Sequence, residues 1–160
     1  MSKRSYPVGG QTIVITTTPT LTESSSYASG DYIGTTSDEM TFSDCALYAG
    51  GGGWISGAVL IDYALQSIST ELWIFDAPIT APADSAAWTV TDAMAKTLVC
   101  VIPFSTYYAS AANSVSMGDG LPKKFICASG STTLYGALVT RGAPTYATGD
   151  LTVRLFIDFD

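Results

Sequence analysis

Histidine is absent from all 160 residues, and this absence sets the first limit on the chemistry that the chain can perform. Without histidine there is no Ser-His-Asp triad, no Cys-His pair and no histidine-ligated zinc. Serine and threonine are abundant, but no G-x-S-x-G sequence accompanies them. Because a nucleophile would lack an activating base, we expect a protein that is not an enzyme.

The three cysteines, Cys45, Cys100 and Cys127, stand singly, without the C-x-x-C spacing of a zinc site or a redox pair. Cys100 and Cys127 lie inside the apolar runs LVCVI and FICAS. We therefore expect free buried thiols, with a Cys100–Cys127 disulfide as the alternative. Free thiols agree with synthesis in the cytoplasm.

The densest group of carboxylates is Asp31, Asp38, Glu39 and Asp44, which lacks the D-x-D-x-D-G spacing of a calcium loop. Solvated turn carboxylates are the favoured interpretation, and bound metal is the alternative. The four glycines at 50–53 are expected to form a loop in which the backbone bends freely or passes close to another chain segment. Gly-Lys-Ser/Thr does not follow them, so this is not a phosphate-binding loop. We predict no metal and no cofactor.

A five-residue word occurs twice, as YASGD at 27–31 and YATGD at 146–150. The favoured interpretation is a repeated corner between loop and strand. Its tyrosine would pack at the edge of the core while its aspartate accepts hydrogen bonds from local amides. A pair of equivalent ligand or metal loops is the alternative.

Aromatic residues offer the best candidates for binding. Trp54 follows the glycine run and Trp88 lies in a long proline-containing segment, so both are candidate partner-binding residues, with packing in the interior as the alternative. Trp73, inside ELWIFD, is expected in the core.

The elements that position these residues are short strands separated by turn signals, with little amphipathic helix. A short helix is expected near 91–95, with Thr91 as its N-cap. The pattern predicts an all-β fold, a jelly-roll-like or other Greek-key β-sandwich of eight to ten strands, with a closed barrel as the alternative. Strands are expected near 11–18, 32–35, 39–43, 54–66, 71–76, 97–104, 113–117, 123–128, 132–140 and 151–159.

Residues 11–160 are expected to form one β-sandwich domain, preceded by an N-terminal arm over residues 1–10. The arm has no core-forming pattern, and its Lys3, Arg4 and Tyr6 are candidate partner-binding residues. No apolar stretch long enough for a signal peptide follows Lys3 and Arg4, and no run approaches the length of a membrane span. We expect a soluble protein without a membrane partner.

The composition is 47% hydrophobic and only 13% charged, with a formal net charge of −7. Seven basic residues and a pI near 4.2 argue against nucleic acid as a partner. The composition therefore indicates a compact domain whose surface is polar through hydroxyl groups more than through ions.

Three stretches, YASGDYIG at 27–34, LWIFDAPITAPADSAAW at 72–88 and LYGALVTRGAPTYATGDLTVRL at 134–155, together resemble a group of small tailed-phage virion proteins. Some members of that group are head decoration, or cement, proteins. The resemblance implies a non-enzymatic β-sandwich on the outer capsid surface of the virion. It also implies a homotrimer that clamps neighbouring subunits of the major capsid protein. The shared words are structural, so they assign no functional residue.

A phage capsid decoration protein is thus the expected function. The alternative is a tail- or fibre-associated virion component that binds host surface carbohydrate, and an orphan hydrolase is a third possibility.

Overall fold

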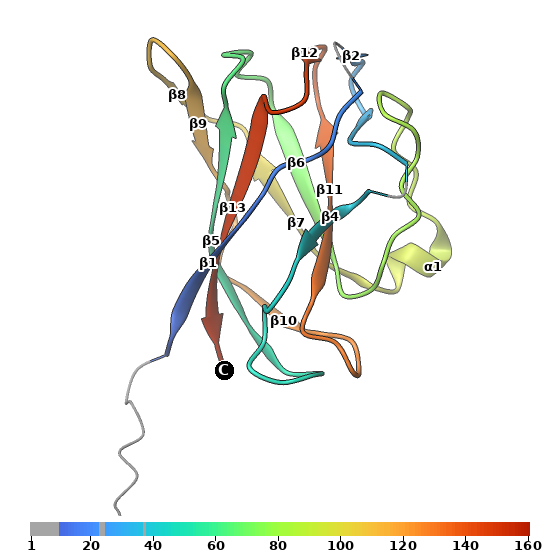
Figure 1. The fold of residues 1–160 in the computed structure, drawn as a ribbon, viewed down its shortest axis with the longest axis vertical. Helices are drawn as coiled ribbons and strands as arrows, with labels where there is room; N and C mark the ends of the chain where they lie inside the picture. Colours follow the sequence, from blue (N-terminus) through green and yellow to red (C-terminus); the bar gives the residue numbers. More distant parts are fainter. Residues whose placement is uncertain (1–9, 23–24, 37) are drawn as a thin grey trace, which may run out of the picture.

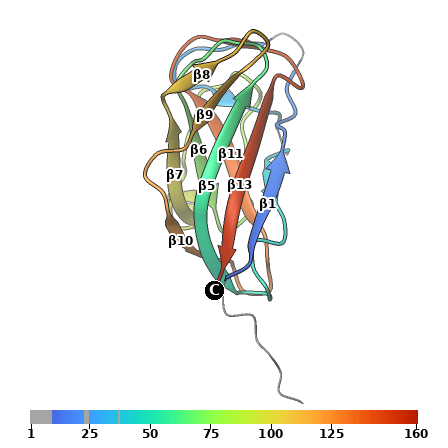
Figure 2. The same cartoon turned by 90° about the vertical axis from the view of Figure 1, so that its left-hand side faces the viewer.

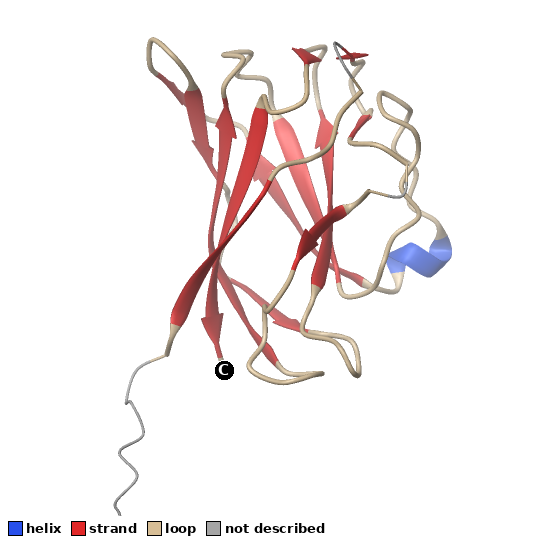
Figure 3. Cartoon of the chain, in the orientation of Figure 1, coloured by secondary structure: helices blue, strands red, loops and turns tan. Residues whose placement is uncertain are grey.

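The computed structural model describes residues 10–22, 25–36 and 38–160, and it is built almost entirely of strands (Figures 1 and 3). The one helix assigned in these residues is α1 (Asp92–Ala95). The strands are β1 (Thr12–Thr17), β2 (Ser25–Ser26), β3 (Tyr32–Ile33), β4 (Met40–Phe42), β5 (Gly52–Asp62), β6 (Thr70–Phe75), β7 (Leu98–Phe104), β8 (Tyr107–Ala109), β9 (Ser114–Met117), β10 (Lys123–Ile126), β11 (Leu134–Thr140), β12 (Thr145–Tyr146) and β13 (Leu151–Phe159).

Two antiparallel sheets pack face to face, which confirms the predicted all-β sandwich (Figure 2). The six-stranded sheet has the order β1-β13-β5-β9-β8, with β10 also paired to β5. The five-stranded sheet has the order β3-β11-β6-β7, with β4 also paired to β11. No helix in the described part of the chain is long and apolar enough to cross a membrane.

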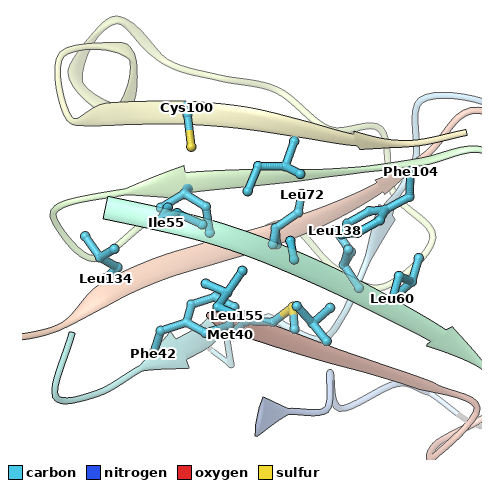
Figure 4. Close-up of a cluster of buried hydrophobic side chains, with 14 of the residues drawn as sticks. Met40, Phe42, Ile55, Leu60, Leu72, Cys100, Phe104, Leu134, Leu138 and Leu155 are labelled. Atoms are coloured by element: carbon cyan, nitrogen blue, oxygen red, sulfur yellow. The ribbon is translucent and has the colours of Figure 1, made fainter. Parts of the chain in front are cut away.

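The core fills the space between the two sheets (Figure 4). Alternate residues of each strand point inward, as the period-2 pattern requires. β13 shows this most clearly, because its residues alternate between buried and half-buried from Leu151 to Asp158. The interior is apolar and well filled, with Ile55, Leu60, Leu72, Phe104, Leu138 and Leu155 among its fully buried side chains.

The glycine run differs from expectation, because Gly52 and Gly53 belong to strand β5 rather than to a loop. These two residues lie where the strand passes close to both of its neighbours. A Cβ on Gly52 would lie 2.5 Å from the carbonyl oxygen of Phe125, and one on Gly53 would lie 2.5 Å from that of Asp158. Glycine is needed here for close backbone approach. The pairing of β5 with β13 is irregular next to Gly57.

The described ranges contain thirteen strands where the prediction was eight to ten, and three of them, β2, β3 and β12, are only two residues long. Such short pairings leave no periodic signal in a sequence. The helix prediction is confirmed, because the Thr91 hydroxyl accepts a hydrogen bond from the Met94 amide at 3.2 Å and caps α1.

The segment 77–96, which includes α1, crosses the outer side of the five-stranded sheet (Figure 1). It forms a second apolar cluster with that sheet, separate from the core between the sheets. We call this side of the sandwich the covered face; its cluster consists of Tyr32, Trp73, Phe75, Ile79, Ala81, Trp88, Val90, Met94, Tyr135 and Ala137.

Candidate functional site

The repeated word forms two equivalent turns, as the favoured interpretation predicted. In the first, Asp31 accepts a hydrogen bond from the Ala28 amide at 2.6 Å, and in the second, Asp150 accepts one from the Ala147 amide at 2.7 Å. Each turn contains a glycine at positive φ, near 96° and 92°. Because both carboxylates accept hydrogen bonds from their own turns, these turns act as structural corners.

The two corners lie side by side. Strands β2 and β12, each next to one of the corners, pair with each other, and the Tyr27 amide donates to the Pro144 carbonyl at 3.0 Å. Tyr27 and Tyr146 are buried, with their ring centroids 6.1 Å apart. The repeat therefore joins two distant parts of the chain at one end of the sandwich.

A further carboxylate, that of Asp62, also has a structural role. Asp62 is fully buried and accepts hydrogen bonds from the amides of Ala64 at 2.9 Å and Ser67 at 2.7 Å. This pairing holds the tight loop after β5, in which Leu65 and Ser67 have positive φ. Among the described residues, no group of three or more Cys, Asp or Glu side chains is placed to hold a metal ion.

All three cysteines are free and buried, as predicted. Burial raises the pKa of the Cys45 thiol to about 12 and that of Cys100 to about 11. The reactive species of cysteine is the thiolate, so both groups remain protonated and unreactive at neutral pH. They act as small apolar side chains in the core.

Trp88 and Trp73 both lie in the cluster of the covered face. The Trp88 ring stacks on Tyr32, with centroids 5.6 Å apart, and meets Trp73 and Phe75 edge-on at 6.2 Å. Trp73 was expected in the core between the sheets, but it points to the outer side of the five-stranded sheet. It is half-buried there because the crossover covers it.

Burial also sets the chemistry of the aromatic groups in this cluster. The Tyr32 hydroxyl has its pKa raised by burial and, to a lesser extent, by Glu39, Asp38 and Asp84. Neither this hydroxyl nor the Trp88 indole N–H has a hydrogen-bond partner among the described residues. The Trp88 indole N–H is buried, so it is not presented to solvent or to a partner molecule.

Trp54, in contrast, is 41% exposed. It belongs to the outward side of the six-stranded sheet, which Figure 2 views directly. The Lys124 ammonium lies 5.0 Å from the centre of its ring and also pairs with Asp160. We call this outward side the open face; its apolar side chains are the exposed Val14, Trp54, Tyr108 and Met117 and the half-buried Val59, Ile61, Val115 and Phe156.

The open face is unusual because an antiparallel sheet with one side in water normally alternates apolar residues inward and polar residues outward. Here β5 carries large apolar residues on both sides, and the outward side of β9 carries Val115 and Met117. The charged side chains of the face balance, since Lys124 and Arg154 are matched by Asp158 and Asp160. The net charge of −7 therefore lies elsewhere on the chain.

A second exposed apolar group lies at the end of the sandwich where β5 begins. We call it the apolar tip: Leu47 is 61% exposed, Tyr48 68% and Ile126 63%. Residues 43–51 and 127–133, the two loops at this end in Figure 1, are tied together by backbone hydrogen bonds. The Cys45 amide donates to Thr132 and the Gly50 amide to Ser131, both at 2.8 Å. Leu47 and Tyr48 are thus presented on a fixed loop pair, next to Ile126, the last residue of β10.

Lys3, Arg4 and Tyr6, the other predicted partner-binding residues, lie outside the described residues, as does the rest of the predicted arm except Gly10. Gly10 directly precedes the end of β1 that pairs with the end of β13. The described chain therefore begins at the same end of the sandwich as the apolar tip. The sequence analysis did not identify the tip as a candidate site. The one signal in its two loops is the consecutive apolar pair Leu47-Tyr48.

No protein-family model matches this chain, and no curated protein matches its sequence.

Proposed function

We propose that this chain is a phage head decoration protein that binds the outer surface of the capsid and stabilises the shell. The observation that carries the proposal is the apolar tip, where Leu47 and Tyr48 extend into solvent from a hydrogen-bonded loop pair beside the exposed Ile126 at the end of β10. Exposed apolar groups of this kind mark surfaces that bind other proteins. The proposal gives the chain a binding role without catalysis.

The position of the predicted arm also favours the end of the sandwich with the apolar tip as the end that faces the capsid. The predicted arm at residues 1–10 would leave the sandwich at Gly10, next to the end of β13. Lys3 and Arg4 would then meet acidic groups of the major capsid protein while the apolar tip covers an apolar part of the same surface. An arm and a tip together bind more tightly than either alone, because the second contact becomes intramolecular.

The homotrimer implied by the resemblance belongs to this proposal. Three copies at a local three-fold position would contact several capsid subunits at once, so contacts that are weak singly add to a high avidity. In this arrangement the protein holds neighbouring capsid subunits together.

The test is co-sedimentation of the purified chain with capsids that lack it. Tyr48→Ser and deletion of residues 2–10 should each weaken binding at least tenfold and leave thermal unfolding nearly unchanged. Tyr63→Ser is the matched control, because Tyr63 is also an exposed tyrosine, 48% exposed, but follows the opposite end of β5. Unchanged binding by the tip variant and the arm deletion would overturn the proposal.

The second candidate function is a tail- or fibre-associated component that binds host carbohydrate, and the exposed ring of Trp54 favours it. Aromatic rings present an apolar face on which a sugar can stack. The copy number per virion, measured by quantitative mass spectrometry, separates the two functions. A number close to that of the major capsid protein supports decoration, whereas a few copies, together with glycan binding that Trp54→Ala abolishes, support the second function.

A further inference from the structure

We propose that two copies of this chain pair through their open faces, with strand β13 of one copy stacked antiparallel on β13 of the other. This pairing does not depend on capsid binding, since the proposed capsid contacts lie at the apolar tip and the arm. Its basis is that the open face is complementary to itself in charge and in the placement of its apolar residues.

The outward row of β13 provides the first argument. Arg154, Phe156 and Asp158 follow one another at two-residue intervals and all point away from the core. A two-fold axis that lies between two facing sheets and passes through Phe156 at right angles to the strand reverses this row. Arg154 of each copy then stands opposite Asp158 of the other, and the two Phe156 rings meet at the axis.

The distances between packed sheets allow these ion pairs. Facing sheets lie about 10 Å apart, a gap that an arginine and an aspartate side chain span together. Aligned sheets cross at about 30°. This angle displaces residues two positions from the axis by only roughly 3 Å sideways, given a rise of about 3.4 Å per residue. Both pairs therefore remain within reach of a salt bridge.

The Arg154 guanidinium is available for such a pair. It lies over the Phe156 ring, 5.4 Å from the ring centre, and has no ion-pair partner within the described ranges. Asp158 accepts a hydrogen bond from the Thr12 hydroxyl, which fixes its carboxylate on the face. One cation and one carboxylate are thus held at matching distances on either side of an aromatic centre.

The neighbouring strands fit the same axis. On β1, Val14 stands level with Phe156 and is flanked by Thr12 and Thr16. The axis therefore places Val14 of one copy opposite Val14 of the other, and Thr12 opposite Thr16. On β5, Trp54 stands level with Asp158 and Val59 level with Arg154. The axis therefore places the exposed Trp54 ring of each copy against the apolar Val59 of the other.

The charge distribution favours a second copy of the chain, rather than another molecule, as the partner that covers the open face. The chain carries a net charge of −7, so two copies repel each other over most of their surface. On the open face the four charged groups balance: the axis places Arg154 of each copy opposite Asp158 of the other, while Lys124 stays paired with Asp160 of its own copy. Burying a large apolar sheet face with matched charges is the arrangement found in homodimer interfaces.

The experiment is sedimentation velocity with the full chain over a series of concentrations. The expected mass is an even multiple of the 16.7 kDa chain, whether the pairing acts alone or links two trimers. Arg154→Asp and Asp158→Arg, made singly, place like charges opposite each other and should weaken the pairing about 100-fold or more. The double variant R154D/D158R restores opposite charges across the axis and should restore the mass.

Lys96→Glu is the matched control, because it changes the charge in the same sense as Arg154→Asp but lies at the end of α1, on the covered side. It should leave the mass unchanged. Circular dichroism of each variant checks that it is folded. A wild-type mass of one or three chains at all concentrations overturns the pairing without touching the capsid proposal, and so does a folded double variant that stays unpaired.

Discussion

On one outer side of the sandwich, Trp88 and α1 cover the five-stranded sheet, whereas on the other side Trp54 and Met117 of the six-stranded sheet face solvent. Both sheets carry apolar residues outward as well as inward. On the covered face the chain supplies its own cover from segment 77–96 and gains a second cluster. On the open face the described residues supply none. The covered face thus contributes to folding, whereas the open face is the one that we propose for association.

The largest expected difference between the faces concerns their tryptophans. Trp88→Ala removes a ring stacked on Tyr32 and in contact with Trp73 and Phe75, and should lower the free energy of unfolding by about 3 kcal/mol. Trp54→Ala removes a largely exposed ring and should cost less than about 1 kcal/mol in the single chain. Urea unfolding at low protein concentration measures both, and equal losses would contradict the comparison.

Asp84 tests how the cover is held in place. Its carboxylate accepts hydrogen bonds from the Tyr27 hydroxyl and the Thr22 amide, both at 2.7 Å, and so ties segment 77–96 to the segment before β3. Asp84→Ala should lower the free energy of unfolding by about 2 kcal/mol, because hydrogen bonds to a charged group are lost.

Asp92→Ala is the control for Asp84→Ala, since Asp92 is an exposed carboxylate of the same crossover. Thermal unfolding of the two variants should therefore separate clearly. If Asp84→Ala were as stable as Asp92→Ala, the crossover would be held by its apolar contacts alone.

The cap of α1 should have a smaller effect. Thr91→Ala removes the acceptor for the Met94 amide and should cost about 1 kcal/mol. Met94 is the buried residue of this helix, so loosening α1 loosens one edge of the cover. Thr91→Ser keeps the acceptor and should retain most of the stability; the same loss in both variants would show that the methyl group, and not the cap, matters.

The smallest expected effect concerns Glu71, at the margin of the covered face. Its carboxylate accepts hydrogen bonds from Arg141 at 2.6 Å and from the Trp73 indole at 3.1 Å. The bond from Arg141 is the main cause that lowers the pKa of Glu71 below its usual value of 4.5. The ionised form is therefore favoured in the folded state. The stability gained is present above pH 4.5 and is lost as the pH falls through the lowered pKa.

Glu71→Gln should accordingly lower the melting temperature slightly at neutral pH, by an amount that corresponds to at most about 1 kcal/mol for an exposed pair. The difference from the wild type should shrink as the solution is made more acidic. Melting curves of both proteins across this pH range measure it, and a difference that grows in acid would refute the ion-pair explanation.

Much of this architecture was predictable from the sequence because alternation is a local property. The strands from β5 to β7 and from β9 to β11, as well as β13, follow apolar runs, and Thr91 announces the helix. What covers a strand is not local. Trp73 and Trp54 occupy similar apolar runs, yet only Trp73 is covered, by a segment that follows it in the chain. The sequence left both exposure and packing open for Trp54, which the structure shows 41% exposed, whereas the stacking of Trp88 depends on Tyr32, far away in sequence.

The pairing of the first and last long strands has a mechanical consequence. β1 and β13 are antiparallel, with Thr12 opposite Asp158. The beginning of β1 and the end of β13 therefore lie at the same end of the sandwich. A force that pulls Gln11 away from Phe159 loads their hydrogen bonds one after another, as in opening a zipper, rather than all together in shear. If a partner grips the arm before β1, tension on that arm would peel β1 from its sheet while the interior strands stay in place.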